Sequence, residues 1–209
     1  MTPSRDGIEE AAAAARRGDL IVVPTDTVYG IGTRPDDPAA TARVFEAKRR
    51  PERLELPVLV GSLEEARSVA SFDERAERLS AACWPGALTL VLPRTEASAG
   101  WELGGEATTV GVRVPDHRLA LAVLARSGPL AVTSANRSGE PPARTCAALH
   151  EIFGDAVAVY LCRDEPLEGV ASTVLDLAHG PARIVRAGSI DAGRLAGLLG
   201  QELDSLTSR

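Results

Sequence analysis

Four polar stretches of this sequence follow short apolar runs or helical segments, and their side chains are suited to binding anions. They are VPTDTVYGIG at 23–32, KRRP at 48–51, SANRSG at 134–139, and a set made of Arg113, Ser172, Thr173 and Arg186. In open α/β sheets, ligands bind beyond the carboxyl ends of strands, where loops expose backbone N–H groups. Hydroxyl, amide and guanidinium groups at such ends predict a site for phosphate or carboxylate oxygens.

The same stretches argue against several kinds of enzyme. They contain no nucleophile, histidine and acid that would form a covalent catalytic set. The chain has neither a GxxxxGK[ST] phosphate loop nor a GxGxxG stretch after a strand, which excludes an ordinary P-loop and gives no support to a dinucleotide fold. Taken singly, each stretch is also explained as a hydroxyl-rich turn, a solvated helix end or a surface ion pair. Their shared chemistry favours a phosphate-bearing substrate.

Length and composition describe an ordinary globular chain. It has 209 residues, 44% of them hydrophobic, and a formal net charge of −6. We expect one domain over residues 1–209, with its core at about 7–200 and a frayed tail at 204–209. The net charge does not imply an extended basic face for duplex nucleic acid. The longest apolar run, 119–125, is too short to cross a membrane, and residues 1–18 lack a signal-peptide core, so we expect a cytoplasmic protein.

Cysteine and histidine usage predicts neither disulfides nor a metal. Cys83, Cys146 and Cys162 form no CxxC pair and no even set, so we expect buried thiols. The three histidines are scattered, and none has the i, i+4 spacing of a preformed metal site. We therefore predict no structural metal.

Strand and helix patterns alternate along the chain. Helices are expected at about 6–17, 37–50, after the Ser62–Glu65 capping box, and at 73–83, 116–126, 146–153 and 190–200. Strands are expected at 20–24, 56–60, 88–92, 109–114, 129–134, 156–161, 172–177 and 182–186. This order predicts an α/β fold with a mixed open sheet whose two faces are both covered.

Seven segments, taken in order, give the chain a resemblance to the threonylcarbamoyl-AMP synthase family with its YrdC-like domain. They are PTDTVYG at 24–30, KRRP at 48–51, WPGALT at 84–89, VRVPDH at 112–117, SANRSG at 134–139, STVLD at 172–176 and RAG at 186–188. The resemblance covers about residues 7–200. One such segment would be a weak signal, but their joint occurrence in this order is specific.

The resemblance implies a twisted, open mixed sheet with flanking helices around a concave, cationic cavity. It implies an L-threonylcarbamoyladenylate synthase, a nucleotidyltransferase that joins L-threonine, bicarbonate and ATP into threonylcarbamoyl-AMP and pyrophosphate. Mg²⁺ would accompany the ATP. The product would pass to downstream transferase proteins that make N6-threonylcarbamoyladenosine in tRNA.

Carried over to matching positions, the resemblance also implies roles for individual residues. Lys48 and Arg50 would be the catalytic cations and would hold the ATP phosphates. The further ATP-binding residues would be Thr109, Asn136 and Arg186. The threonine-binding residues would be Thr27, Tyr29, Arg113, Ser134 and Ser172, with Arg113 facing the carboxylate and Tyr29 lining the cavity.

Two features depart from the family pattern. Three residues after the KxRP proline, the family usually has Asn or Lys followed by Pro-Leu, whereas this chain has Leu54 and Glu55. Three explanations stay open: the adjacent Arg53 replaces the missing polar ligand, the ATP site is weakened, or the chain is a diverged paralogue. Some members also carry an additional C-terminal domain, so this chain resembles the short, single-domain type.

Two other functions stay open. One is a module of the same fold that binds nucleotide or RNA without synthase activity, which a steep salt dependence of RNA affinity would support. The other is carbamoyl-adenylate formation from a different carbamoyl source, as in larger carbamoyltransferases that contain a similar domain. ATP–pyrophosphate exchange that depends on threonine and bicarbonate would exclude binding as the sole role.

Overall fold

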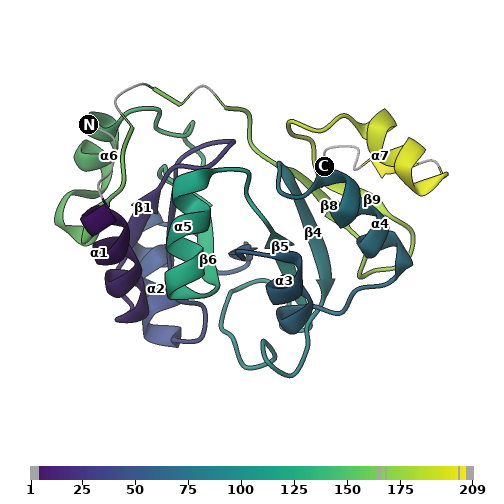
Figure 1. Ribbon diagram of the computed structural model, residues 1–209, viewed down its shortest axis with the longest axis horizontal. Coiled ribbons are helices and arrows are strands. Elements are labelled where there is room, and N and C mark those ends of the chain that lie inside the picture. Colours follow the sequence, from purple (N-terminus) through teal and green to yellow (C-terminus); the bar gives the residue numbers. More distant parts are fainter. Residues whose placement is uncertain (1–4, 164–165, 168, 202, 206–209) are drawn as a thin grey trace.

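A ten-stranded mixed sheet forms the centre of the computed structural model, which describes residues 5–163, 166–167, 169–201 and 203–205 (Figure 1). The strands are β1 (Ile21–Val23), β2 (Gly30–Thr33), β3 (Val58–Leu59), β4 (Leu88–Pro93), β5 (Thr109–Arg113), β6 (Leu130–Ser134), β7 (Val159–Tyr160), β8 (Thr173–Asp176), β9 (Arg183–Arg186) and β10 (Asp204–Ser205). Their order across the sheet is β10-β9-β8-β4-β5-β3-β6-β2-β1-β7. Four of the neighbouring pairs are parallel and five are antiparallel, which confirms an open mixed sheet.

Helices flank this sheet near both of its ends. They are α1 (Arg5–Arg16), α2 (Pro38–Lys48), α3 (Leu63–Val69), α4 (Glu74–Cys83), α5 (Arg118–Ser127), α6 (Cys146–Phe153) and α7 (Ala192–Leu199), with a short 3-10 helix at Gly154–Ala156. Helices α1 and α5 lie side by side over the end of the sheet that contains β6, β2 and β1. Helix α4 lies beside α7 at the other end (Figure 1).

Local sequence signals explain where the helices begin. The Asp37 carboxylate accepts the N–H groups of Ala39 and Ala40 at the start of α2, as the Asp-Pro pair predicts. At α3, the Ser62 hydroxyl accepts the N–H of Glu65 at 3.1 Å. The Glu65 carboxylate accepts the N–H of Gly61 at 2.6 Å rather than that of Ser62, so the capping box closes one residue earlier than expected.

Two strands were not expected from the sequence. Residues 30–33 looked like part of a polar loop, yet they form β2 between β1 and β6. A Cβ on Gly30 would lie 2.4 Å from Cγ1 of Val132, so a pattern of glycines, not of β-branched residues, marks this strand. The expected frayed tail is wrong at Asp204 and Ser205, which pair in parallel with β9; positions 206–209 lie outside the described residues.

The expectation of three free thiols is wrong. Cys146 and Cys162 form a disulfide across 16 residues of sequence, with their Cα atoms 5.6 Å apart, while Cys83 is a buried free thiol. Cys146 opens α6 and Cys162 follows β7, so the chain's turn after α6 brings them together. That approach is a tertiary feature, which the spacing of the cysteines along the sequence does not reveal.

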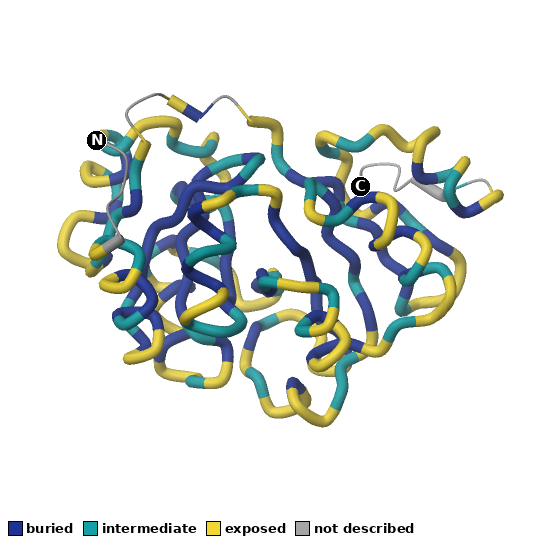
Figure 2. The backbone as a smooth tube through the Cα atoms, in the orientation of Figure 1, coloured by how far each residue is buried: buried dark blue, intermediate teal, exposed yellow. Residues whose placement is uncertain are grey.

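The two faces of the sheet have different surroundings. On one face, the apolar side chains of β4 and β5 enter the main core, among them Leu90 and Val112. The tube of both strands is coloured mostly as buried in Figure 2. On the other face, a smaller apolar cluster under α1 and α5 includes Leu59 and Val132, and both of these residues also line an open cavity. The helices therefore cover only part of this second face, which corrects the expectation that both faces are fully covered.

The RAG segment packs tightly on the chain that leads into β8. A Cβ on Gly188 would lie 2.3 Å from the carbonyl oxygen of Ala171 and 2.3 Å from the carbonyl carbon of Ser172, and both neighbours are backbone atoms. This contact fixes the end of β9 against the start of β8.

We predict that Gly188→Ala lowers the free energy of unfolding by about 2 kcal/mol, because neither backbone segment can move away cheaply. Gly197→Ala is the matched control. Gly197 lies in α7, and a Cβ added there would meet no heavy atom within 4 Å, so this change should stabilise by about 0.5–1 kcal/mol. Denaturant unfolding measures both, and a Gly188→Ala protein as stable as the parent would contradict this packing.

Candidate active site

A cavity of about 480 Å³ opens on the second face of the sheet. Its volume lies in the range of small-molecule sites, about 300–1,000 Å³. Polar and charged residues from most of the sequence-predicted segments line it: Thr25, Thr27, Arg50, Glu55, Thr89, Arg113, Thr133, Ser134, Ser172 and Arg186. The structure thus brings together six of the ten predicted site residues: Thr27, Arg50, Arg113, Ser134, Ser172 and Arg186.

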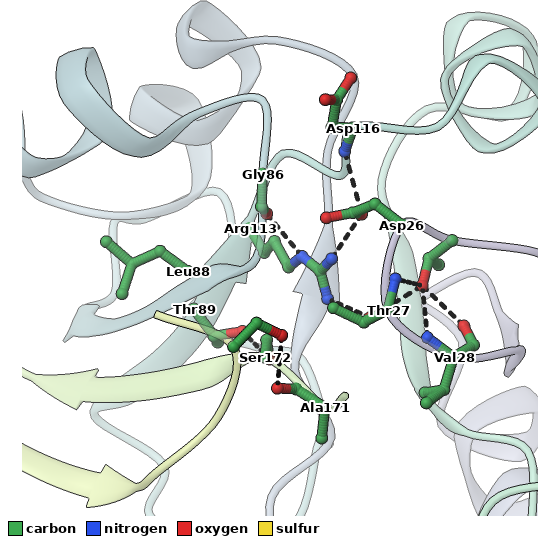
Figure 3. A network of polar contacts seen from close by, with 12 residues as sticks. Asp26, Thr27, Val28, Gly86, Leu88, Thr89, Arg113, Asp116, Ala171 and Ser172 are labelled. Atoms are coloured by element: carbon green, nitrogen blue, oxygen red, sulfur yellow. Dashed lines mark hydrogen bonds and ion pairs between the residues drawn. The ribbon is translucent and has the colours of Figure 1, made fainter. Parts of the chain in front are cut away.

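Arg113 ends β5 and is the deepest of the cavity's cations, with 5% of its surface exposed. Three acceptors from two segments of the chain hold its guanidinium group, as Figure 3 shows. Nε donates to the carbonyl oxygen of Gly86 at 2.8 Å, and the other two nitrogens donate to the Thr27 hydroxyl at 3.0 Å and the Asp26 carboxylate at 2.5 Å. Asp26 is itself fixed by the N–H of Asp116 at 3.0 Å. Arg113 keeps N–H bonds free for a ligand, because a guanidinium group has five.

The loop before β2 is a compact hydroxyl turn. The Thr25 hydroxyl accepts the N–H groups of Thr27 and Val28, donates to the Val28 carbonyl oxygen at 2.6 Å, and lies 2.9 Å from the Thr27 hydroxyl. A Cβ on Gly169 would meet the Thr27 carbonyl oxygen at 1.5 Å, so another backbone segment lies directly against this loop. Thr27 is thereby fixed beside Arg113.

Arg50 comes from the chain that follows α2. Arg49 ends that helix in the left-handed conformation, with φ of 51°, and the chain turns away from the helix axis before Pro51. Arg50 is half-buried and donates to the carbonyl oxygens of Leu54 and Glu55 at 3.0 and 2.8 Å. The left-handed residue explains how Arg50 leaves the helix and reaches the cavity.

Arg186 lies at the cavity rim, where it is exposed to solvent. Its Nε and NH2 nitrogens donate to the carbonyl oxygen of Ser172, and NH2 also lies 2.9 Å from the Ser172 hydroxyl. That hydroxyl lies 2.9 Å from the hydroxyl of Thr89 (Figure 3). Arg186 in β9, Ser172 just before β8 and Thr89 in β4 thus form one polar wall of the cavity.

The charge of Arg186 repels the charges of both Arg113 and Arg50 across the cavity. Burial lowers the pKa of Arg113, the Asp26 carboxylate opposes that shift, and the charge of Arg186 lowers it further. Burial also lowers the pKa of Arg50, again with a contribution from Arg186. Asp26 is a carboxylate partner for Arg113, whereas the contacts of Arg50 and Arg186 described above are to carbonyl and hydroxyl oxygens. Clustered cations with so little compensation favour the binding of an anion.

Lys48 and Asn136 stand behind the cavity wall instead of in it. Lys48 is 1% exposed, and its ammonium group donates to the carbonyl oxygens of Ser134 and Asn136, the latter at 2.6 Å. The Asn136 amide donates to the carbonyl oxygens of Arg137 and Glu140 at 2.7 and 2.6 Å. Burial and the charge of Arg50 lower the pKa of Lys48 to about 7. In this structure both side chains hold the SANRSG loop in place; their predicted contacts with ATP stay predictions.

Tyr29 and Thr109 also lie outside the cavity lining. Tyr29 is fully buried in the main core, and its hydroxyl accepts the N–H of Arg163 at 3.0 Å, so the expectation that it lines the cavity is wrong. Successive side chains of an extended chain point to opposite faces. Gly30 lines the cavity, so the side chain of Tyr29, next to it, points to the other face. Thr109 is buried at the start of β5, four residues from Arg113, and its ATP-binding role stays a prediction.

Three residues that organise the site were not among the predicted ones: Asp26, Gly86 and Thr89. Asp26 and Gly86 hold Arg113, and Thr89 contacts Ser172. All three belong to segments that the sequence singles out, PTDTVYG and WPGALT. Sequence order alone does not show which member of each segment faces which partner.

Comparison with known proteins decides the family. A family model named Sua5/YciO/YrdC, described as "Telomere recombination", matches residues 13–188. The chain belongs to this family.

Several relatives of this family member are named threonylcarbamoyl-AMP synthase. A threonylcarbamoyl-AMP synthase of Chromohalobacter salexigens is 39% identical over 184 residues, which cover 86% of this chain and 97% of the relative. The structure of Pyrococcus abyssi Sua5 complexed with L-threonine superposes with a TM-score of 0.84 and is 35% identical; the match covers 94% of this chain and 58% of that one. Escherichia coli YciO superposes with a TM-score of 0.81 at 26% identity, covering 91% and 93% of the two chains. These neighbours also confirm the expected fold class.

The described part of the family member has no helix that is both long and apolar enough to span a membrane.

Arg113 and Arg186 should respond differently to loss of charge. We predict that Arg113→Met lowers the free energy of unfolding by about 3 kcal/mol, because Asp26, with 17% of its side chain exposed, loses its ion-pair partner. The double variant Arg113→Met with Asp26→Asn should recover most of that loss. Arg186→Met should stay within about 0.5 kcal/mol of the parent, because Arg186 is exposed and paired with no carboxylate in the contacts above.

A binding measurement distinguishes a ligand-binding role of Arg186 from a purely structural one. Arg186→Met should weaken pyrophosphate binding at least about tenfold, the effect of one lost charge-assisted contact. Thermal melts without ligand and calorimetric titration with pyrophosphate measure the two properties. Unchanged stability in Arg113→Met, or unchanged pyrophosphate affinity in Arg186→Met, would contradict the arrangement.

Proposed function

We propose that this family member is an L-threonylcarbamoyladenylate synthase, which joins L-threonine, bicarbonate and ATP into threonylcarbamoyl-AMP and pyrophosphate. The observation that carries the proposal is the convergence of Arg50, Arg113 and Arg186, from three distant segments, on one cavity of about 480 Å³. The names of the relatives agree with it, including a Pyrococcus structure complexed with L-threonine.

The reaction makes chemical sense in a site without a covalent nucleophile. The amine of threonine attacks the carbon of bicarbonate, which gives a carbamate and water. A carbamate oxygen then attacks the α-phosphorus of ATP, and pyrophosphate leaves in line. Both reactants are anions, so the protein's task is to align them and to stabilise the charge that builds up on pyrophosphate.

The three guanidinium groups divide this task by their depth. Arg113, beside the Thr27 hydroxyl, suits the threonine carboxylate, which a guanidinium group binds in a bidentate manner. Arg50 and Arg186, nearer the solvent, suit the phosphates of ATP. Lys48 supports them by fixing the carbonyl oxygens of Ser134 and Asn136, and so the SANRSG loop. Mg²⁺ would accompany ATP and would supply further positive charge for the leaving pyrophosphate, beside the charges of Arg50 and Arg186.

The proposal also says which proteins use the product. Threonylcarbamoyl-AMP would be consumed by transferase proteins that modify adenosine in tRNA, in the cytoplasm. The alternative of a nucleotide- or RNA-binding module is not favoured by the names of the relatives. The alternative of another carbamoyl source is not supported either: a HypF structure superposes with a TM-score of 0.72 at 19% identity, which shows a shared fold and no more.

We predict that the purified protein releases pyrophosphate only when ATP, bicarbonate and L-threonine are all present, with the adenylate detected by mass spectrometry. Arg50→Ala should lower the rate at least about 100-fold, because it removes a charge that stabilises the transition state. Lys48→Ala should also abolish turnover while the fold is retained. Full activity in Arg50→Ala would contradict its assignment to the phosphates, and full activity in Lys48→Ala would contradict its support of the SANRSG loop.

Arg49→Asn is the matched control from the same KRRP run. Arg49 is exposed, does not line the cavity and has a left-handed backbone, which asparagine tolerates. It should keep the parent rate. If pyrophosphate release needs no threonine, the protein has a different acceptor and the proposed function fails.

A further inference from the structure

Bicarbonate is the one reactant that the three cavity arginines do not account for. Arg113 suits the threonine carboxylate, and Arg50 and Arg186 suit the phosphates of ATP. The carbamate must form between these two places, because only the α-carbon and the nitrogen of threonine separate the carbamate carbon from the carboxylate carbon. A site for bicarbonate is therefore expected on the cavity wall between Arg113 and Arg186.

Thr89 is the neighbour of Arg113 on this wall. Leu90 of β4 pairs with Val112 of β5 in an antiparallel register, so the next residues, Thr89 and Arg113, lie opposite each other. Both line the cavity and therefore stand on the same face of the sheet. The Cβ atoms of such directly opposite residues are about 4.5–5.5 Å apart.

Ser172 continues the wall toward Arg186. The hydroxyl groups of Ser172 and Thr89 lie 2.9 Å apart (Figure 3), and the NH2 nitrogen of Arg186 lies 2.9 Å from the same Ser172 oxygen. Strands β5, β4, β8 and β9 are consecutive neighbours in the sheet. Along the wall, two short hydroxyl side chains thus stand between two long cations, Arg113 and Arg186.

The hydroxyl pair has a proton to give to a ligand. Each hydroxyl group has one proton, and the hydrogen bond between Thr89 and Ser172 uses only one of the two. The Ser172 oxygen accepts an N–H of Arg186, which leaves the remaining proton unused. Among the described residues, no further acceptor contacts either hydroxyl group. One O–H bond is therefore left for a ligand in the cavity.

The surroundings of the pair favour an anion as that ligand. Thr89 and Ser172 are each 4% exposed, so water competes little for their hydroxyl groups. The charge of Arg186 contributes to the lowered pKa of Arg113, in agreement with two positive charges that flank the pair. Bicarbonate carries a negative charge, and its oxygens accept hydrogen bonds. A small anion of this kind fits a buried O–H donor between two guanidinium groups.

We propose that the hydroxyl pair of Thr89 and Ser172 binds bicarbonate and then the carbamate formed from it. This inference rests on the proposed function and adds Thr89 to it as a substrate-binding residue. The spare hydroxyl proton donates to an oxygen of bicarbonate beside the threonine held on Arg113. After the carbamate forms, the same contact holds one of its oxygens while the other faces the α-phosphate of ATP. Ser172, which the family resemblance assigns to threonine, then contacts the carbamate end of that substrate.

The kinetic test is Thr89→Val, which keeps the shape of the side chain but has no hydroxyl group. At saturating ATP and L-threonine, the KM for bicarbonate in pyrophosphate release should rise at least about tenfold, the effect of one lost hydrogen bond to a charged ligand. The KM values for ATP and L-threonine should stay close to those of the parent. Thr89→Ser keeps the hydroxyl group and should restore the parent's KM for bicarbonate.

Thr33→Val is the matched control. Thr33 is a buried residue of β2 that does not line the cavity, and its hydroxyl oxygen has no hydrogen-bond partner among the described residues. This variant should keep all three KM values of the parent.

Ser172→Ala decides the question if Thr89→Val does not fold. It removes the other hydroxyl group of the pair and should likewise raise the KM for bicarbonate at least about tenfold. An unchanged KM for bicarbonate in a folded variant of either kind would overturn the proposal.

A binding measurement distinguishes bicarbonate from threonine as the ligand of Thr89. In solutions freed of bicarbonate, calorimetric titration should give Thr89→Val the parent's affinity for L-threonine. An affinity about tenfold weaker would show that Thr89 contacts threonine itself, and would overturn the proposal. Threonine-dependent pyrophosphate release by the parent would then leave the proposed function standing. A parent that releases no pyrophosphate would overturn the proposed function and this inference together.

Discussion

The guanidinium group of Arg113 is withdrawn from water, and much of the site's geometry follows from how this charge is accommodated. A carbonyl oxygen from the WPGALT turn, a hydroxyl and a carboxylate from the PTDTVYG loop each take one of its nitrogens. Both segments are separated from β5 along the sequence, by more than 15 residues. Removing any one leaves a buried donor or acceptor unpaired, so the interactions lock three distant parts of the chain to one another.

The other two cavity arginines show a different balance between stability and function. Backbone carbonyl oxygens orient Arg50 and Arg186, and these oxygens carry no full charge to offset the repulsion among the guanidinium groups. Burial of apolar side chains of β4 and β5, such as Leu90 and Val112, stabilises the fold and offsets the cost of this arrangement. An anionic substrate would relieve the repulsion, so the site is better suited to its bound state than to its empty one.

The sequence predicted most elements of this fold for local reasons, and the exceptions have identifiable causes. Helix caps at Asp37 and Ser62 are read from neighbouring residues, and both are found. The strand at Gly30–Thr33 was missed because its glycines serve close approach to β6, a contact between distant segments. The site shows the same division: strand-end positions such as Arg113 and Ser172 were predicted, whereas the burial of Tyr29 and the position of Lys48 behind the wall depend on which face each side chain takes. The Cys146–Cys162 disulfide likewise depends on tertiary approach.

The central claim is that cations from separate loops form one pocket for a triphosphate beside a small amino acid. The most direct measurement is a crystal structure of the protein with L-threonine and a non-hydrolysable ATP analogue. The account predicts phosphate oxygens within hydrogen-bond distance of Arg50 and Arg186, and the threonine carboxylate on Arg113. Ligand density elsewhere, with these three side chains still held by the protein alone, would contradict it.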